Sequence, residues 1–339
     1  MTTELPVLRL GLAGFSAEQQ DELSRLVAMV STGPVSWVLS SLDCADAWLV
    51  NGVKVLDLGD KRIRINPGLP KARSIQVHMT EMDRPIGFSR PVSVSMPTFS
   101  FDFGSASSLG ALLRKFEVWQ SAIVAQVCLA AHIVEHQGAL RSGVFTLTRG
   151  SGMLATVSMH GEITVLATAV PGDFESSVWR RESGELQIPD NFVRTTMSQL
   201  MWQYATRTGK DLLPPHYRTG AIYFRRAPRL PQRLIGDTHL LLLRELANAP
   251  ATFDALLRRC EVPARNLASD LAALYFVGSI TSNPKRAANP PSPTASAELE
   301  TVQGPASNLP SGLDSIPPDM VRQMSGDNDM TAPGPIGPH

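Results

Sequence analysis

The chain has 339 residues, 43% of them hydrophobic, and its 31 basic residues balance 31 acidic ones. This length exceeds one ordinary hydrophobic core and predicts about two to three domains. A net charge of zero excludes a strong overall attraction to nucleic acid or to an anionic membrane, so a nucleic-acid site has to be a local basic patch. No run approaches the ~18 apolar residues of a membrane span, and residues 1–15 lack the pattern of a secretory signal. We therefore expect a soluble, cytoplasmic protein without membrane contact.

The cysteine pattern agrees with a reducing compartment. Cys44, Cys128 and Cys260 are odd in number, far apart and embedded in apolar stretches. Such cysteines are typically buried and reduced, so we expect structural thiols.

Residues 1–98 alternate between short apolar runs and one amphipathic helix, a pattern typical of an α/β domain. The helix is predicted over Ala17–Val30, with Ser16 as its cap. Gly and Pro turns separate the runs. We expect strands over residues 7–12, 35–39, 45–50, 63–65, 74–79 and 86–88.

Three segments of this domain lie where a response-regulator receiver domain has functional residues. The run ADAWLVNG places Asn51 at the position of the phosphorylatable Asp of the third strand. Residues 12–14, Leu-Ala-Gly, replace the acids that hold magnesium, and the run FSRP supplies Arg90 and Pro91 in place of the Lys-Pro of the fifth strand. The domain thus resembles a degenerate receiver domain, with a short segment between Asn51 and Arg90.

This resemblance implies a pseudo-receiver that takes no phosphoryl group. An Asn side chain has no carboxylate to attack a phosphodonor, and without the acids no magnesium neutralises the developing charge. The domain would then serve as a docking or dimerisation surface. A generic small α/β domain explains the same pattern and stays an alternative.

Residues 99–234 predict a central α+β domain. Residues 108–140 form a long helical stretch that is apolar on more than one face, which indicates burial between layers or at a subunit contact. Glycines at turn positions then favour an antiparallel meander of three strands. These strands are expected over residues 144–148, 153–159 and 163–166. A further helix is expected over residues 192–206, followed by a Pro- and Arg-rich connector that ends near Leu234.

Residues 235–286 predict three short helices followed by a short strand, the ground plan of a winged helix. Asp237, Thr252 and Pro263 are the expected start signals, and Gly278 supplies a left-handed cap after the third helix. The helices are expected over residues 238–247, 253–260 and 263–278, and the strand over residues 279–282. This arrangement resembles the winged-helix modules of bacterial regulators, in which the third helix is the recognition helix.

The third helix is expected to bury one face and to expose a polar one. Apolar side chains recur at helical spacing on the buried face. The residues expected to face outward are Arg265, Asn266, Ser269 and Asp270. Arg and Asn side chains suit base edges, whereas Asp270 repels phosphate. The module is therefore expected either to contact duplex DNA or to act as a protein-binding or packing unit.

A local basic segment precedes this module. Residues 191–234 contain eight Arg or Lys residues against Asp211 alone, a net of 8 − 1 = +7, with aromatic residues interleaved. Arginines beside aromatic rings suit phosphate contacts and base stacking. A solvated face with Arg stems packed on neighbours is the alternative. The candidate nucleic-acid or anion-binding residues are Arg218, Arg225, Arg226, Arg229, Arg233, Arg265 and Asn266.

Residues 287–339 are rich in Pro, Ser, Gly and Asn and contain no aromatic residue. Six acids oppose Arg322, which gives a net charge of 1 − 6 = −5. Such a segment buries too little apolar surface to offset its chain entropy, so we expect a disordered, acidic, Pro-rich tail.

His132, Glu135 and His136 spell H-x-x-E-H, the inverted zinc-protease pattern, near the end of the long helical stretch. No third carboxylate ligand is evident downstream, so we interpret the pattern as a chance match at a polar helix end. The sequence has no phosphate loop, dinucleotide fingerprint, C-x-x-C pair or nucleophile elbow. We expect no catalytic residue, no metal and no cofactor.

These features favour a non-enzymatic signalling or transcriptional regulator of bacterial type, with a non-phosphorylatable receiver-like input and a winged-helix output. Its expected partners are a protein of a signalling pathway, duplex DNA and a second copy of the chain. Two alternatives stay open: a protein-binding scaffold without DNA contact, and an effector that binds a small anionic nucleotide through the Arg-rich connector.

Overall fold

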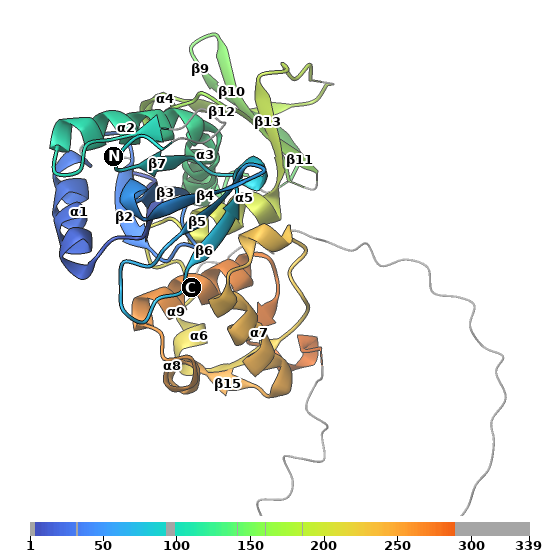
Figure 1. Ribbon diagram of the computed structural model, residues 1–339. Coiled ribbons are helices and arrows are strands. Elements are labelled where there is room, and N and C mark those ends of the chain that lie inside the picture. The colour runs from blue at the N-terminus through green and yellow to red at the C-terminus, as the bar shows by residue number, and fades with distance from the viewer. Residues whose placement is uncertain are drawn as a thin grey trace, which may run out of the picture.

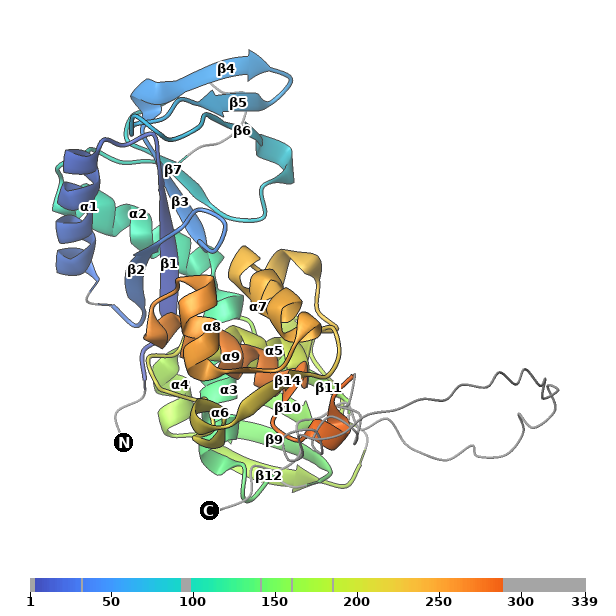
Figure 2. The same ribbon diagram turned by 90° about the horizontal axis from the view of Figure 1, so that it is seen from below.

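The computed structural model describes residues 4–31, 33–92, 99–140, 142–159, 161–184 and 186–288. Its elements form an N-terminal unit around a parallel sheet, a central antiparallel sheet, and a C-terminal group of helices with a small sheet (Figures 1 and 2). The predicted mixture of helices and several sheets is confirmed at this level.

The N-terminal sheet is parallel and has the strand order β2-β1-β3-β7-β8. Its strands are β1 (Val7–Ala13), β2 (Ser36–Ser40), β3 (Ala47–Val50), β7 (Ile86–Phe88) and β8 (Phe99–Ser100). Helices α1 (Ala17–Val30) and α2 (Ala106–Trp119) pack on each other, and their apolar faces share one core with Leu8 and Leu10 of β1. The first three predicted strands and the last of the domain are confirmed.

Helix α1 has the predicted bounds, and its first turn shows why. Ser16 Oγ accepts a hydrogen bond from Gln19 N at 3.3 Å, and Gln19 Oε1 accepts one from Ser16 N at 3.0 Å. This reciprocal capping box satisfies two backbone N–H groups at the start of the helix. The helix then buries Leu23, Leu26 and Val27 against the sheet core.

An antiparallel sheet of order β4-β5-β6 is inserted between β3 and β7. Its strands are β4 (Val55–Gly59), β5 (Arg62–Ile65) and β6 (Ile75–His78). Ile63 and Ile65 share a separate small core with Val50 and Phe88 of the parallel sheet. The predictions for β5 and β6 are confirmed. β4 is missing from the prediction because most of its side chains are exposed, without the alternation of burial that marks a strand.

The long helical stretch predicted over residues 108–140 is wrong as a single element. Helices α2 and α3 (Ser121–His136) meet at Gln120 with a bend of 69°. The Gln120 side chain donates a hydrogen bond to Asp46 O at 2.5 Å, which holds this corner against the N-terminal sheet. Taken singly, no helix of the described residues has the length and apolarity to cross a membrane; α2 and α3 together reach both, but across the bend.

The central sheet is antiparallel, with the order β12-β9-β10-β11-β13. Its strands are β9 (Val144–Arg149), β10 (Gly152–Ser158), β11 (Glu162–Leu166), β12 (Val178–Glu182) and β13 (Phe192–Thr196), with helix α4 (Pro171–Glu175) before β12. The predicted meander is confirmed as β9, β10 and β11, and β12 and β13 extend it on both sides.

The helix predicted over residues 192–206 is wrong in its first five residues, which form β13. Thr195 and Thr196 are β-branched and favour a strand. Helix α5 (Met197–Ala205) begins after Thr196, whose Oγ1 accepts a hydrogen bond from Gln199 N at 3.2 Å. This cap fixes the start of the helix.

The C-terminal group contains short helices and a small sheet of order β15-β14-β16. Its elements are α6 (His216–Thr219), β14 (Ala221–Phe224), α7 (Asp237–Asn248), β15 (Ala251–Thr252), α8 (Phe253–Cys260), α9 (Ala264–Phe276) and β16 (Ile280–Thr281). Helix α8 has the predicted bounds, and Gly278 has the expected left-handed backbone, with φ of 67°. The cap predicted at Asp237 is wrong, because α7 starts at that residue and Gly236 occupies the cap position.

Two predicted boundaries cut through units of the structure. β8 and α2 lie beyond residue 98, yet β8 pairs with β7 and α2 packs on α1. β14 lies inside the predicted connector, yet it is the central strand of the small C-terminal sheet. The predicted tail lies outside the described residues from Asn289 onward.

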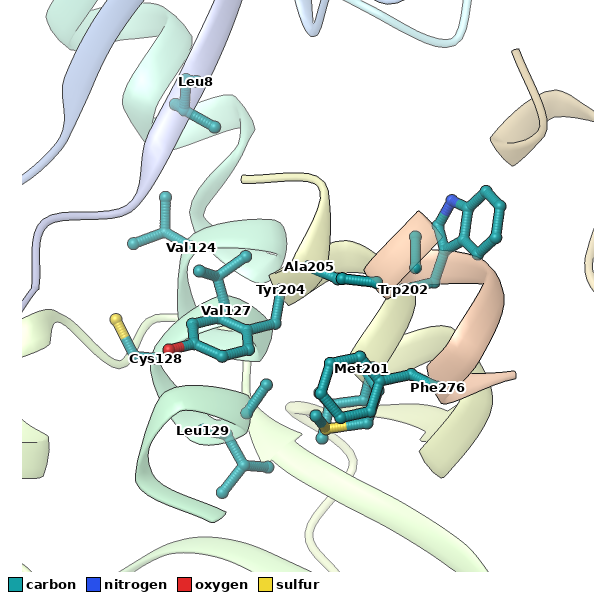
Figure 3. Close-up of a cluster of buried hydrophobic side chains, with 14 of the residues drawn as sticks. Leu8, Val124, Val127, Cys128, Leu129, Met201, Trp202, Tyr204, Ala205 and Phe276 are labelled. Carbon is teal, nitrogen blue, oxygen red and sulfur yellow. The ribbon is translucent and has the colours of Figure 1, made fainter. Parts of the chain in front are cut away.

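One buried core joins the units. Figure 3 shows side chains of four elements in this cluster: Leu8 of β1, Val127 of α3, Trp202 and Tyr204 of α5, and Phe276 of α9. Helix α5 packs against both α3 and α9. Helix α9 of the C-terminal group is therefore held on the central domain.

Candidate functional site

Asn51 lies at the carboxyl end of β3, with Gly14 at the end of β1 and Arg90 after β7 beside it. Asn51 Nδ2 donates a hydrogen bond to Gly14 O at 3.1 Å, and Asn51 Oδ1 accepts one from Val53 N at 3.1 Å. The Cγ atom and the backbone O and N atoms of Arg90 lie within 3.3 Å of the place where a Cβ on Gly52 would stand. The structure therefore brings the two predicted residues, Asn51 and Arg90, together.

This end of the sheet is closed by the inserted strands. Asn51 is 5% exposed. A Cβ on Gly14 would stand 3.2 Å from side-chain atoms of Lys54 and Ile65, and Gly68 crosses the backbone of Phe15 at close range. The polar atoms of Asn51 are thus used within the fold, where they tie β1 to the short helix η1 (Gly52–Lys54).

His132 and His136 share one face of the last turns of α3, and their rings stack with centroids 4.3 Å apart. Glu135 instead pairs with Lys210, with Oε1 3.3 Å from Nζ. The His132 ring also lies 5.6 Å from that of Trp179 of β12. In the part of the chain that the structure describes, no group of His, Cys, Asp and Glu side chains has the arrangement to hold a metal ion.

The His132 site predicts a pH dependence of stability. Burial lowers the pKa of His132, and the neighbouring His136 lowers it further. Since an unfolded histidine takes up its proton near pH 6.5, the unfolded state binds more protons below that pH, and the free energy of unfolding falls as the pH drops. Urea unfolding between pH 5 and 8 is expected to show a smaller fall for His132→Gln, with the exposed His216→Gln as control. Equal pH profiles for the two variants would contradict this assignment.

The N-terminal unit is fastened to the loop that follows α5. The Glu4 carboxylate accepts hydrogen bonds from Thr208 Oγ1 at 2.5 Å and from Gly209 N at 2.6 Å. Arg265 of α9 reaches the same loop, with Nη2 3.5 Å from Gly209 O. We call residues 206–210 the hub loop, because it contacts both the first strand and the last long helix.

A buried ion pair completes this junction. The Asp46 carboxylate pairs with Arg207 of the hub loop and accepts a hydrogen bond from Arg9 N at 2.9 Å; Asp46 is 7% exposed and Arg207 9%. The Arg9 guanidinium donates to Thr206 O. Burial lowers the pKa of Arg9, the charge of Arg207 lowers it further, and Asp46 acts in the opposite direction. Asp46 therefore compensates buried positive charge.

The predicted outward face of the third helix is wrong for Ser269 and Asp270. Ser269 Oγ donates a hydrogen bond to the last carbonyl of α5 at 2.8 Å, and Asp270 Oδ1 lies 3.3 Å from His239 Nε2. Arg265 and Asn266, nearer the start of α9, are exposed as predicted. The reason is the packing of α9 on α5, which covers the middle of a face that helical periodicity alone assigns to solvent.

Sequence reasoning misses His239, which is 6% exposed in α7. Its ring centroid lies 4.5 Å from that of Trp202, and its Nδ1 accepts a hydrogen bond from Gly236 N at 3.2 Å. A Cβ on Gly236 would stand 3.4 Å from Cys44 Sγ, so the N-terminal unit approaches the same place. His239 occupies an ordinary buried position of a helix. Its contacts come from other elements, so no local sequence pattern predicts them.

Arg225 and Arg226 follow β14 and turn around the end of α9. Their backbone N–H groups donate to Ser279 O at 2.9 and 3.4 Å. Their guanidinium nitrogens approach within 3.4 and 3.1 Å of the place where a Cβ on Gly278 would stand. Burial raises the pKa of Tyr217 to about 12, and Arg225 acts in the opposite direction, which places its charge near that ring.

Two further cations come to this end of the small sheet. The short helix η4 (Pro284–Arg286) follows β16, and Ala288 N then donates a hydrogen bond to Phe224 O at 2.9 Å. Lys285 and Arg286 thus stand three and two residues before a bond to the last residue of β14, which Arg225 directly follows. We call these residues, Arg225, Arg226, Lys285 and Arg286, the basic turn. The sequence-based prediction of the binding residues leaves out Lys285 and Arg286 because they follow the last expected strand, residues 279–282.

The basic turn carries net positive charge. Arg225, Lys285 and Arg286 are exposed, and among the described residues no carboxylate lies within ion-pair distance of them. A helix C-terminus amounts to roughly half a negative charge, so the end of α9 offsets a small part of the charge of the three exposed cations. The remainder is available to an external anion.

The other predicted binding residues lie outside the basic turn. Arg218 pairs with Asp211 at 2.5 Å and lies over the Phe253 ring at 5.0 Å. Arg229 and Arg233 are exposed along the segment that leads to α7. Arg265 and Asn266 stand near the other end of α9.

Of the predicted site residues, the structure therefore groups Asn51 with Arg90 and Arg225 with Arg226, while Arg265 and Asn266 stand together at the start of α9. Cys128 and Cys260 are buried and Cys44 is half-buried, all three as free thiols. Comparison of the chain with protein families, with curated proteins and with solved structures finds no match in any of the three.

Proposed function

We propose that this chain is a non-enzymatic regulator whose C-terminal module binds duplex DNA through phosphate contacts of the basic turn. The supporting observation is that four cations of two distant segments adjoin β14 along the chain: Arg225 and Arg226 directly follow it, and Lys285 and Arg286 directly precede the segment that bonds to Phe224. Three of them have no carboxylate partner within the described residues. Lys and Arg contacts to phosphate supply most of the affinity of sequence-independent DNA binding, because they release condensed counterions.

This binding mode differs from that of a recognition helix. In a winged helix the third helix lies in the major groove and presents side chains to base edges. Ser269 and Asp270 of α9 are instead engaged with α5 and His239. The expected DNA contact is therefore made to the backbone and is independent of sequence.

For the N-terminal unit we infer the role of a pseudo-receiver. With β7 and β8 counted as the fourth and fifth strands, its parallel sheet has the order 2-1-3-4-5 of flavodoxin-like folds. Asn51 stands at the end of the third strand, and it offers an amide where a phosphoacceptor needs a carboxylate. Both observations support a domain that acts by docking and takes no phosphoryl group.

A protein-binding scaffold without DNA contact is the second candidate. It is favoured by the hub loop, where contacts of Glu4, Arg265 and Lys210 join three units. The alternative of a small nucleotide effector is less well supported. Its candidate arginines do not converge, because Arg218 is engaged with Asp211 and Arg265 lies at the hub loop.

The DNA proposal predicts a steep dependence of affinity on salt. Binding of the full chain to a short duplex is expected to weaken with a log–log slope of roughly −0.9 per phosphate contacted. Replacing Arg225 and Arg286 by alanine is expected to flatten this slope by about 1 to 2 units and to weaken binding to unrelated duplexes equally. Fluorescence anisotropy at several salt concentrations measures both quantities.

A matched control removes the same charge elsewhere. Arg25 and Arg62 are exposed on the N-terminal unit, so Arg25→Ala with Arg62→Ala is expected to leave the slope unchanged. An equal effect of both double variants would show that net charge alone matters and would contradict the role of the basic turn. Phosphate contacts are strong at about 50 mM salt. If the full chain binds no duplex there, the DNA proposal is wrong and the protein-binding scaffold becomes the favoured function.

A further inference from the structure

The described chain ends at the basic turn. Ala288 N donates its hydrogen bond to Phe224 O at 2.9 Å. Phe224 directly precedes Arg225, and Ala288 stands two residues after Arg286. Residues 289–339 therefore continue from the side of a positively charged surface. Because residues 289–339 are attached next to this surface, their concentration near it is high even without electrostatic attraction.

The charge of the continuing segment is opposite to that of the basic turn. Within residues 289–339, Arg322 is opposed by six acids, a net of 1 − 6 = −5. These acids are Glu298, Glu300, Asp314, Asp319, Asp327 and Asp329. Whole-chain neutrality therefore conceals two regions of opposite sign that adjoin at Ala288.

The segment is long enough to reach the surface. Glu298 is the first acid and stands 10 residues beyond Ala288. An extended chain covers at most about 3.6 Å per residue, so this acid can lie up to roughly 36 Å from Ala288. The basic turn lies well inside that radius, and the later acids have greater reach.

We propose that residues 289–339 occupy the basic turn in the free protein and compete there with polyanions. This inference rests on the proposed DNA contact of the same surface. A single exposed ion pair contributes little, but a tethered partner acts at an effective concentration of about 1 mM. If the untethered segment binds with a Kd of about 0.3 mM, the surface is occupied about three-quarters of the time and the affinity for DNA falls roughly fourfold.

Neutralising the acids in the full chain tests this competition. The variant carries Glu298→Gln, Glu300→Gln, Asp314→Asn, Asp319→Asn, Asp327→Asn and Asp329→Asn. Its affinity for a short duplex is expected to be roughly fourfold higher than that of the unaltered chain at low salt, with the difference lost at high salt. An unchanged affinity, in a chain that does bind DNA, would overturn the proposal.

Zero-length crosslinking tests the contact without DNA. Carbodiimide joins a carboxylate to an amine in contact with it, and Lys285 is the one lysine of the basic turn. Mass spectrometry of the full-length monomer is expected to find Lys285 joined to Asp314, Asp319, Asp327 or Asp329, with exposed Lys71 of the N-terminal unit as control. Replacing Arg225 and Arg286 by alanine is expected to lower the yield several-fold.

The two experiments separate this proposal from the proposed function. Crosslinks at Lys285 that depend on the two arginines, in a chain that binds no duplex, would support the tail contact and contradict the DNA function. Crosslinks of equal yield in the Arg225→Ala, Arg286→Ala chain, or of equal yield at Lys71, would overturn the tail contact. DNA binding that is insensitive to neutralisation of the acids would also overturn the tail contact, but it would be compatible with the proposed DNA function.

Discussion

Replacement of Asp46 by alanine is expected to lower the free energy of unfolding by about 3 to 5 kcal/mol, the usual result of breaking a buried ion pair from one side. Asp46 is 7% exposed and pairs with Arg207, which is 9% exposed. Its other carboxylate oxygen accepts a hydrogen bond from Arg9 N, and the Arg9 guanidinium is itself buried enough to lower its pKa. Without the carboxylate, the positive charges of Arg9 and Arg207 repel each other without compensation in a buried junction. Urea unfolding at neutral pH measures the loss.

Two further variants separate the buried charge from other effects of the substitution. Glu22→Ala removes the exposed i,i+3 pair with Arg25 on α1 and is expected to cost less than about 1 kcal/mol. Asp46→Leu combined with Arg207→Met is expected to cost less than Asp46→Ala alone, because no unpaired charge at Arg207 stays behind. If Asp46→Ala costs no more than Glu22→Ala, the pair is not buried in solution as the structure has it.

Gly68→Ala is expected to destabilise the protein by about 3 kcal/mol, the upper range for overpacking. A Cβ at this position would stand 2.1 Å from Phe15 O and 2.7 Å from Gly14 C. These are backbone atoms, which cannot turn aside as the end of a flexible side chain can. The segment after β5 would have to move off the end of β1, and with it the cover over Asn51.

The control is a glycine with open space around it. For Gly172 in α4, nothing within the described residues lies within 4 Å of the position of an added Cβ. Gly172→Ala is expected to be neutral or slightly stabilising, because alanine favours a helix and narrows the unfolded ensemble. Thermal melting of the two variants side by side tests the difference, and similar midpoints would mean that the crossing at Gly68 is looser in solution.

Local chemistry explains which elements the sequence predicts well. Helix α1 and helix α8 have their predicted bounds because Ser16 and Thr252 cap them within three residues. Strand β3 is a continuous apolar run and β1 is apolar apart from Arg9 and Gly11, as a sheet covered by helices requires. In each case the signal and its cause lie within one short stretch of chain.

The errors arise where contacts with residues far away in the sequence determine the local structure. The bend at Gln120 depends on Asp46, 74 residues earlier, and the covered face of α9 depends on Ala205, 64 residues before Ser269. For the basic turn, the sequence likewise predicts only two of the four residues. Arg225 and Arg226 adjoin in sequence, whereas Lys285 and Arg286 come near β14 only through its pairing with β16, which no periodicity reveals.

The bond between Glu4 and Thr208 joins residues that are 204 positions apart, and this has a consequence for the order of events during synthesis. At about 5 to 20 residues per second, Glu4 is made roughly 10 to 40 s before its partner. For most of that interval Arg9 and Asp46 are present without Arg207, and α5 has not yet been completed. A nascent chain that stalls before residue 206 is therefore expected to expose the charged residues Arg9 and Asp46 without their partner, and a chaperone would bind the chain in this state.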